Sequence, residues 1–267
     1  MEREVAWYPG HMAKAERRIR EYLRTMDVVV EVVDARIPRS GRNALLDKLA
    51  ARRARVVALD RQDLADPATT ERWLQYFSDR GASALAVDAR APRSVARIAA
   101  AIEQSSKQRT GRGIARAMIV GVPNSGKSTV VNSLLRRASA KTENRAGVTR
   151  QMQWFRLGPH AELMDTPGVL PPKISGAAAQ WKLALCGAVP RERYDPQEVA
   201  AAFHEWLVEC NRSGGVPDLQ TFAAGRGFVR RGGTVDYHNA AQSYISAFND
   251  GAFGRISLEA PDDVEAA

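Results

Sequence analysis

The segment Gly121–Ser128 carries the residues with the clearest chemistry in the chain. Its sequence, GVPNSGKS, fits the pattern G-x-x-x-x-G-K-[ST], and it lies between an apolar run at 116–120 and a helical pattern that begins near Lys127. Glycines in this context let backbone N–H groups cradle a β-phosphate beside a helix N-terminus. Lys127 is expected to reach the β- and γ-phosphates, and the Ser128 hydroxyl is expected to ligate Mg²⁺. The predicted phosphate-binding residues are Asn124, Ser125, Gly126, Lys127, Ser128, Thr129 and, further along the chain, Gly168.

Two later segments supply groups that such a site needs around a γ-phosphate. Asp165-Thr-Pro-Gly168 follows an apolar run, so that the Asp165 carboxylate can hold Mg²⁺ through water and the Gly168 N–H can contact the γ-phosphate. Thr149 lies in a polar loop between the two motifs and is positioned to complete the Mg²⁺ shell, unless it is an ordinary loop threonine. The predicted Mg²⁺ ligands are therefore Ser128, Thr149 and Asp165, and the predicted catalytic groups include Lys127, Thr149 and Gly168.

A base-binding site is expected at the carboxyl ends of other strands of the same sheet. Asp63 follows the run RVVAL at 55–59, and it can accept hydrogen bonds from N1–H and the 2-amino group of guanine, a pair of donors that adenine does not offer. The predicted base-binding residues are Asp60, Arg61, Asp63, Asp88 and Ala89. The predicted strands at 55–59 and 84–87, which these residues follow, both precede the segment Gly121–Ser128, called the P-loop from here on. In the ordinary GTPase order the corresponding strands follow the P-loop.

Short apolar runs alternate with amphipathic stretches up to about residue 165, and this alternation must position the motifs. The predicted strands are 26–33, 55–59, 84–87, 116–120, 151–157 and 161–164, and the predicted helices are 44–50, 67–78, 94–104 with Ser94 as N-cap, and 127–137. Strands that are apolar on both faces are typical of a parallel sheet covered by helices. The pattern predicts an α/β domain with a doubly wound, mostly parallel sheet.

The pattern changes after Gly168. Residues 169–176 contain two prolines and are expected to be an extended linker. Helical spacing then recurs at 177–188, 196–210, 218–225 and 239–248. We therefore predict two domains, 1–175 with the nucleotide site and 176–267 with a small, mainly helical fold whose acidic end at 259–267 frays.

The charge of the chain is unevenly distributed. The formal net charge is +9, but residues 1–175 hold 31 basic and 18 acidic residues, whereas the remainder is net acidic. Ser105–Arg150 alone holds ten basic residues and one acidic residue, which favours phosphate as a partner, in a nucleotide, a nucleic acid or both, over a merely solvated surface. Two cysteines, no apolar signal segment and no run of 18 apolar residues predict a cytoplasmic protein without a membrane partner.

The chain carries the base motif first, then the P-loop, then two segments that correspond to GTPase switches, the loop with Thr149 and Asp165–Gly168. This order is that of circularly permuted GTPases. The opening Trp7–Met12 with Ala13-Lys14-Ala15, together with Gly121–Ser128 and Asp165–Gly168, resembles the YlqF/RbgA family of ribosome biogenesis GTPases, and the resemblance extends to Phe253–Ser257. It implies a cytoplasmic GTPase that binds GTP, GDP and Mg²⁺, and we expect the protein to be a monomer. It also implies a partner, the precursor of the large (50S) ribosomal subunit with its rRNA and proteins, at a late stage of maturation.

One departure from the family affects the base site. Asp60-Arg61-Gln62-Asp63 stands where the family has Asn-Lys-x-Asp. A carboxylate in place of the asparagine amide would be repelled by the acceptor N7 of guanine unless it were protonated, whereas Arg61 can stack in place of the lysine and Asp63 is retained. The loss of one donor and the added repulsion are together expected to weaken binding by about 1–3 kcal/mol, while the preference for guanine is retained.

Two further roles come from the resemblance alone. Val169 occupies the place where other GTPases carry a water-orienting glutamine, and His11 in the family's Pro-Gly-His-Met segment is the candidate substitute, although it can equally cap or pack the first helix. Asn124 resembles the asparagine with which related GTPases bind K⁺, with local turn bonding as the alternative. Two other functions stay open: a P-loop ATPase or kinase, and an RNA-binding scaffold with little turnover.

Overall fold

The computed structural model describes residues 10–43, 53–110, 114–138, 152–157, 159–170, 174, 176–229 and 234–262, without the side chains of residues 11, 106–110 and 137–138. The contacts divide the chain into two compact units, and each is described by itself. The larger lies within Tyr8–Pro172 and Ser257–Ala267, and the smaller includes Lys173–Ile256. The helix expected at 44–50 lies outside the described residues. Among the described residues, no helix is both long and apolar enough to cross a membrane.

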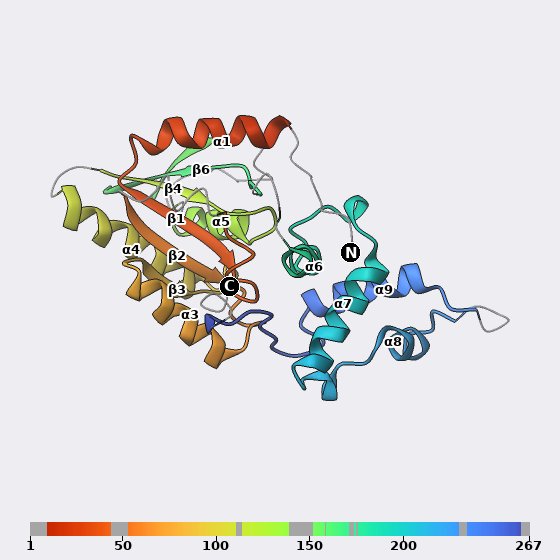
Figure 1. The fold of residues 1–267 in the computed structure, drawn as a ribbon. Coiled ribbons are helices and arrows are strands. Elements are labelled where there is room, and N and C mark those ends of the chain that lie inside the picture. Colours follow the sequence, from red (N-terminus) through yellow and green to blue (C-terminus); the bar gives the residue numbers. More distant parts are fainter. Residues whose placement is uncertain are drawn as a thin grey trace. The chain divides into compact units, whose positions relative to one another are not determined.

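A six-stranded sheet in the order β3-β2-β1-β4-β6-β5 forms the centre of the larger unit (Figure 1). Its strands are β1 (Val28–Asp34), β2 (Ala54–Asp60), β3 (Ser83–Ala86), β4 (Ala115–Val120), β5 (Gln153–Arg156) and β6 (Ala161–Asp165). All neighbours pair in parallel except β5 and β6, which are antiparallel. The predicted fold class, a doubly wound and mostly parallel sheet, is confirmed. Because β1 pairs in register with β2 through Asp34 and Asp60, both carboxylates lie at the same edge of the sheet.

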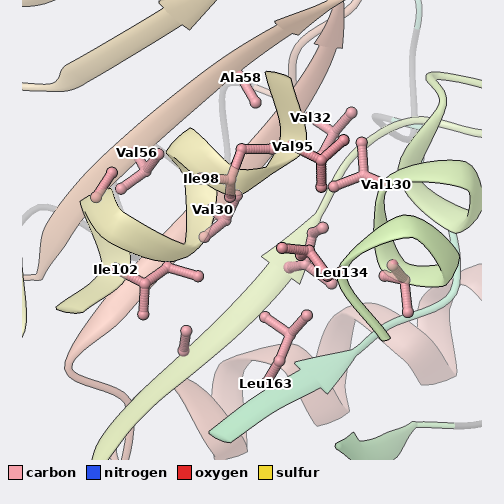
Figure 2. Close-up of a cluster of buried hydrophobic side chains, with 14 of the residues drawn as sticks. Val30, Val32, Val56, Ala58, Val95, Ile98, Ile102, Val130, Leu134 and Leu163 are labelled. Atoms are coloured by element: carbon pink, nitrogen blue, oxygen red, sulfur yellow. The ribbon is translucent and has the colours of Figure 1, made fainter. Parts of the chain in front are cut away.

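Helices cover both faces of this sheet. The helices of the larger unit are α1 (Gly10–Leu23), α3 (Pro67–Asp79), α4 (Pro92–Thr110) and α5 (Lys127–Ala138). Figure 2 shows Val30, Val32 and Val56 of the sheet meeting α4 and α5 side chains such as Ile98 and Leu134. Val33, Val57 and Leu59, which alternate with these along the strands, pack with Trp73 and Phe77 of α3. Strands buried on both faces explain why their sequences are continuously apolar.

The start of α4 differs from the prediction. The helix begins at Pro92 instead of after Ser94, because proline is well tolerated in the first turn, where its missing N–H would be unpaired. Ser94 therefore does not cap the helix from outside. Its hydroxyl accepts a hydrogen bond from the Asp88 N–H at 3.0 Å, which fixes the loop that follows β3.

The smaller unit is helical. It contains α6 (Ala177–Leu185), α7 (Pro196–Glu209), α8 (Leu219–Gly225) and α9 (Tyr237–Asn249), with short 3₁₀ turns at Arg191–Arg193 and Ser213–Gly215. Phe203 of α7 packs edge-on against Phe248 of α9 at 5.0 Å, and Tyr244 packs edge-on against Phe222 of α8 at 5.1 Å between ring centroids. These aromatic contacts give the unit its own core.

The residues after α9 depart from the expected frayed end. Residues 257–262 belong to the larger unit, whereas residues 176–267 were predicted to form one helical domain. The rest of the predicted frayed end, 263–267, lies outside the described residues. Glu259 is 4% exposed, and its carboxylate accepts hydrogen bonds from the backbone N–H groups of Arg39 and Ser40 at 2.7 and 3.0 Å. The indole of Trp73 donates to the Glu259 carbonyl at 3.1 Å. An acidic segment is ordered here because its carboxylate satisfies backbone donors far away in the sequence.

Candidate functional site

The loop between β4 and α5 has the backbone conformation that its sequence predicts. Asn124 and Gly126 have positive φ angles of 57° and 94°, and α5 begins at Lys127. A Cβ atom at Gly121 would lie 2.6 Å from the Val32 carbonyl oxygen, so glycine is required where the loop passes β1. Within the described residues, the buried Ser125 hydroxyl has no hydrogen-bond partner. The loop therefore presents a helix N-terminus and an unpaired donor, as an anion site requires.

The segment after β6 is joined to this loop. The Lys127 ammonium lies 2.8 Å from Oδ1 of Asp165, and both side chains are buried. The Thr166 hydroxyl donates to the Ile119 carbonyl at 2.8 Å, and the Val169 N–H donates to the Gly121 carbonyl at 3.1 Å. A Cβ at Gly168 would lie 2.9 Å from the Pro123 backbone. The structure thus brings Lys127, Asp165 and Gly168 together at the P-loop.

The oxygen donors in this region are of the kind that Mg²⁺ prefers. Asp165 contributes a carboxylate at the end of β6, and Ser128 contributes a half-buried hydroxyl in the first turn of α5. The described residues contain no cluster of three or more histidine, cysteine or acidic side chains that would form a complete protein cage. Mg²⁺ usually takes one or two protein ligands together with substrate phosphates, so the donor set fits this ion.

Asp60 lies beneath the P-loop instead of at an open base edge. Its side chain is 3% exposed, and its Oδ1 accepts a hydrogen bond from the Ala89 N–H at 2.8 Å. Its Oδ2 lies against Gly126, because a Cβ built on that glycine would be only 1.9 Å from this oxygen. Burial raises the pKa of Asp60 to about 6, against the opposing effect of backbone N–H groups and Arg61. The residue therefore joins the P-loop to the loop that follows β3.

Arg61 links the P-loop to the end of β1. Its guanidinium donates to Oδ2 of Asp34 and to the backbone carbonyl of Asn124, each at 3.1 Å. Arg36 also donates to both oxygens of Asp34, at 2.9 and 2.8 Å. Burial alone would raise the pKa of Asp34, but the two guanidinium groups hold that pKa below its usual value. Arg61 thus reaches the P-loop backbone, a contact that its expected stacking on a base did not anticipate.

Asp34 and Arg36 were not among the residues predicted for the site. The signal was present, because Asp34-Ala-Arg36 follows a buried strand and ends at the same sheet edge as Asp60. Charged residues at the carboxyl ends of parallel strands are candidates for a ligand site. What the sequence lacks is the pairing itself, which joins residues 27 positions apart.

Asp63, the residue predicted to recognise guanine, has a side chain that is accessible to solvent. Asp63 accepts from Arg90 at 2.7 Å, and Arg90 is 69% exposed, so this ion pair is weak and a ligand can displace it. The Asp88 carboxylate accepts from the Arg90 N–H at 2.9 Å, and the Ala89 carbonyl accepts from the Ser133 hydroxyl of α5 at 2.6 Å. The loop after β3 is therefore fixed both to Asp60 and to the helix that follows the P-loop.

Two predicted residues cannot be placed. Thr149 and the His11 side chain lie outside the described residues, so their expected roles stay predictions.

Other polar residues of the larger unit are exposed. Asn124 is exposed on the P-loop, and Thr129 is exposed on the first turn of α5. The basic residues Arg17, Arg18 and Arg20 are exposed on α1, whereas Arg24 follows the end of that helix.

The chain is similar to known GTPases in sequence and in structure. The family described as 50S ribosome-binding GTPase matches residues 116–197. Ribosome biogenesis GTPase A of Priestia megaterium is 35% identical over 283 residues, which covers 98% of each chain, and its Thermotoga maritima namesake is 33% identical over 97% of this chain and 96% of its own. The structure of GNP-bound YlqF from T. maritima is similar with a TM-score of 0.71 and 31% identity, over 93% of this chain and 99% of that one. The chain belongs to the ribosome biogenesis GTPase A (YlqF/RbgA) family.

Proposed function

We propose that this chain binds GTP at the P-loop, hydrolyses it with Mg²⁺, and acts late in maturation of the large ribosomal subunit. Family membership makes it a GTPase of ribosome biogenesis. The observation that carries the finer proposal is the junction at the P-loop. There Lys127 pairs with Asp165, and Gly168 packs on the Pro123 backbone. Phosphate, metal and switch groups are therefore adjacent.

In this proposal the phosphates compete with Asp165 for Lys127. The lysine would turn from the carboxylate to the β- and γ-phosphates, which leaves Asp165 to act with Ser128 and Thr149 as Mg²⁺ ligands. The bound metal would neutralise charge that develops on the phosphates during hydrolysis. The Gly168 N–H would contact the γ-phosphate, and Asn124 would hold K⁺ as a further counter-charge.

The base would be held by Asp63, Asp88 and Ala89. Asp63 would exchange its exposed pairing with Arg90 for the N1–H and 2-amino donors of guanine. Asp60 and Arg61 would act from beneath, because their side chains contact P-loop residues Gly126 and Asn124. Guanine preference therefore rests on Asp63, which has the carboxylate that the family motif requires.

We further propose that the partner is a large-subunit precursor, bound by a monomer. The excess of basic residues in 1–175 supports contact with rRNA. Residues 169–176 connect the switch segment to the helical unit along the chain, so loss of the γ-phosphate would be transmitted to that unit. GTP would favour binding to the precursor, and hydrolysis would release the protein.

The decisive experiment titrates GTP, GDP, ATP and XTP against the purified protein. We expect GTP and GDP to bind more tightly than ATP, because adenine lacks the two donors that Asp63 accepts. XTP is included because a carboxylate in the base motif can change the preference among purines. Preferential binding of ATP would favour the P-loop ATPase or kinase instead. Guanine binding without turnover, even with large subunits in single-turnover assays, would favour the RNA-binding scaffold.

A further inference from the structure

The carboxylate of Asp60 is buried directly beneath the P-loop. One oxygen accepts from the Ala89 N–H, and the other is pressed against Gly126, with φ of 94°, one residue before Lys127. The N–H groups of such a loop at a helix N-terminus receive phosphate. A negative charge beneath the loop therefore opposes the phosphates that would bind there.

The cations near Asp60 are engaged elsewhere. Among the described residues Asp60 forms no ion pair, since Arg61 is bonded to Asp34 and the Asn124 carbonyl, and Lys127 faces Asp165. The Asp34 carboxylate on β1 raises the pKa of Asp60, and Arg61 lowers it. On the loop after β3, the charges of Asp88 and Arg90 are paired with each other.

We propose that Asp60 is a positioning residue that carries a proton when nucleotide is bound, so that no negative charge lies beneath the P-loop. The proton comes from solvent as the phosphates arrive, because their negative charge at the P-loop makes a buried carboxylate beside Gly126 still less favourable. This inference rests on the nucleotide site proposed above. It concerns a residue that touches the P-loop and not the nucleotide.

The consequence is a pH-dependent affinity. Burial raises the pKa of Asp60 to about 6 even without a ligand, so that a small further rise brings its titration into the physiological range. Between the pKa of the free state and the higher pKa of the bound state, the wild-type protein takes up a proton as it binds nucleotide. Its affinity should therefore fall up to about tenfold for each unit of pH in that interval.

The test compares wild type with Asp60→Asn, which has a permanent amide donor at the same position. GDP affinity is measured calorimetrically between pH 6 and 8.5 at constant ionic strength. GDP is used because it is not hydrolysed, and its terminal phosphate, which itself titrates near pH 6, affects both proteins equally. We expect the ratio of the wild-type to the variant dissociation constant to rise about tenfold or more across this range. Asp79→Asn, an exposed carboxylate on α3, serves as the matched control and should behave as wild type.

Proton uptake gives a second measurement that does not depend on the variant. Calorimetry at pH 8 in two buffers of different ionisation enthalpy should show that wild-type protein takes up a fraction of a proton as it binds GDP, and that Asp60→Asn does not. A dissociation-constant ratio that is independent of pH, or wild-type binding without proton uptake, would overturn the inference while leaving the nucleotide site intact. Absence of GDP binding by both proteins at every pH would overturn the nucleotide site and the inference with it.

Discussion

Several charged residues at the proposed nucleotide site form buried or partly buried pairs of opposite charge. Lys127 and Asp165 hold the P-loop to the segment after β6, at 2.8 Å. Asp34 holds Arg36 and Arg61 at the end of β1. Removal of one partner from such a pair leaves an uncompensated charge, which costs far more than the pair contributes to stability. The effects of substitutions here combine loss of function with loss of stability.

Lys127→Ala should remove nucleotide binding and also destabilise the protein. The loss of the ammonium leaves Asp165 buried without its partner, which should lower the free energy of unfolding by about 3–5 kcal/mol. The double variant Lys127→Ala/Asp165→Asn should recover most of the stability but not the binding. Urea unfolding and GDP calorimetry separate the two effects. Unchanged GDP affinity in a folded single variant would contradict the assignment of Lys127 to the phosphates.

Asp60→Asn should stabilise the nucleotide-free protein at neutral and alkaline pH. Because burial raises the pKa of Asp60 from 3.8 to about 6, the folded state binds this proton more tightly than the unfolded state. The free energy of unfolding of wild type should therefore fall, relative to the variant, between about pH 4 and pH 6, and stay lower above it by about 3 kcal/mol. Denaturant unfolding at pH 4.5, 6 and 8 checks this. If the difference between the two proteins is the same at all three values, Asp60 does not titrate as described.

At the scale of whole elements, the sequence predicted those features that depend on residues close together in the chain. The P-loop, the six strands and the helices α3 and α5 follow from periodicity, glycine positions and a motif whose parts are adjacent in sequence. Three contacts could not be predicted in the same way: the Asp34–Arg61 ion pair, the contact of Asp60 with Gly126, and the hydrogen bonds that hold Glu259. Each joins residues that are brought together only by the sheet or by the return of the chain end, and no local preference of those residues reveals the partner.

Glu259→Ala should loosen the loop that follows β1. The substitution leaves the N–H groups of Arg39 and Ser40 without their shared acceptor, at a cost of roughly 1–3 kcal/mol in the free energy of unfolding. Asp262→Ala is the matched control on the same segment, because Asp262 is 80% exposed in its ion pair with Arg72 and its loss should cost at most about 1 kcal/mol. Equal effects of the two substitutions in thermal unfolding would mean that Glu259 contributes no more than a surface charge.

For the whole molecule, the uneven charge should determine how binding to large-subunit rRNA depends on salt. Lysines and arginines that neutralise phosphates release counter-ions, so that affinity falls as salt rises. If about 5 phosphates are neutralised, the logarithm of the association constant should fall with that of the salt concentration with a slope between about −3.5 and −4.5. Filter binding or fluorescence anisotropy from 50 to 300 mM KCl measures the slope. A flat response would assign the basic residues to a solvated surface.

The rate of GTP hydrolysis should depend on contact with the large-subunit precursor. With Val169 in the place of a water-orienting glutamine, the isolated protein should turn GTP over slowly, and contact with the large-subunit precursor should dock the N-terminal segment so that His11 aligns the attacking water. A positioned histidine contributes about 10²–10⁴-fold, so His11→Ala should keep GTP affinity and subunit binding but lose most of the stimulated turnover. Such a variant should also stay on the precursor, because release follows hydrolysis.

The turnover of GTP is measured with and without large subunits, in KCl and in NaCl. Glu21→Ala, on the same helix as His11, serves as the control. Equal stimulation of wild type and His11→Ala would remove His11 from the mechanism, and equal wild-type rates in the two salts would remove Asn124 as a K⁺ ligand.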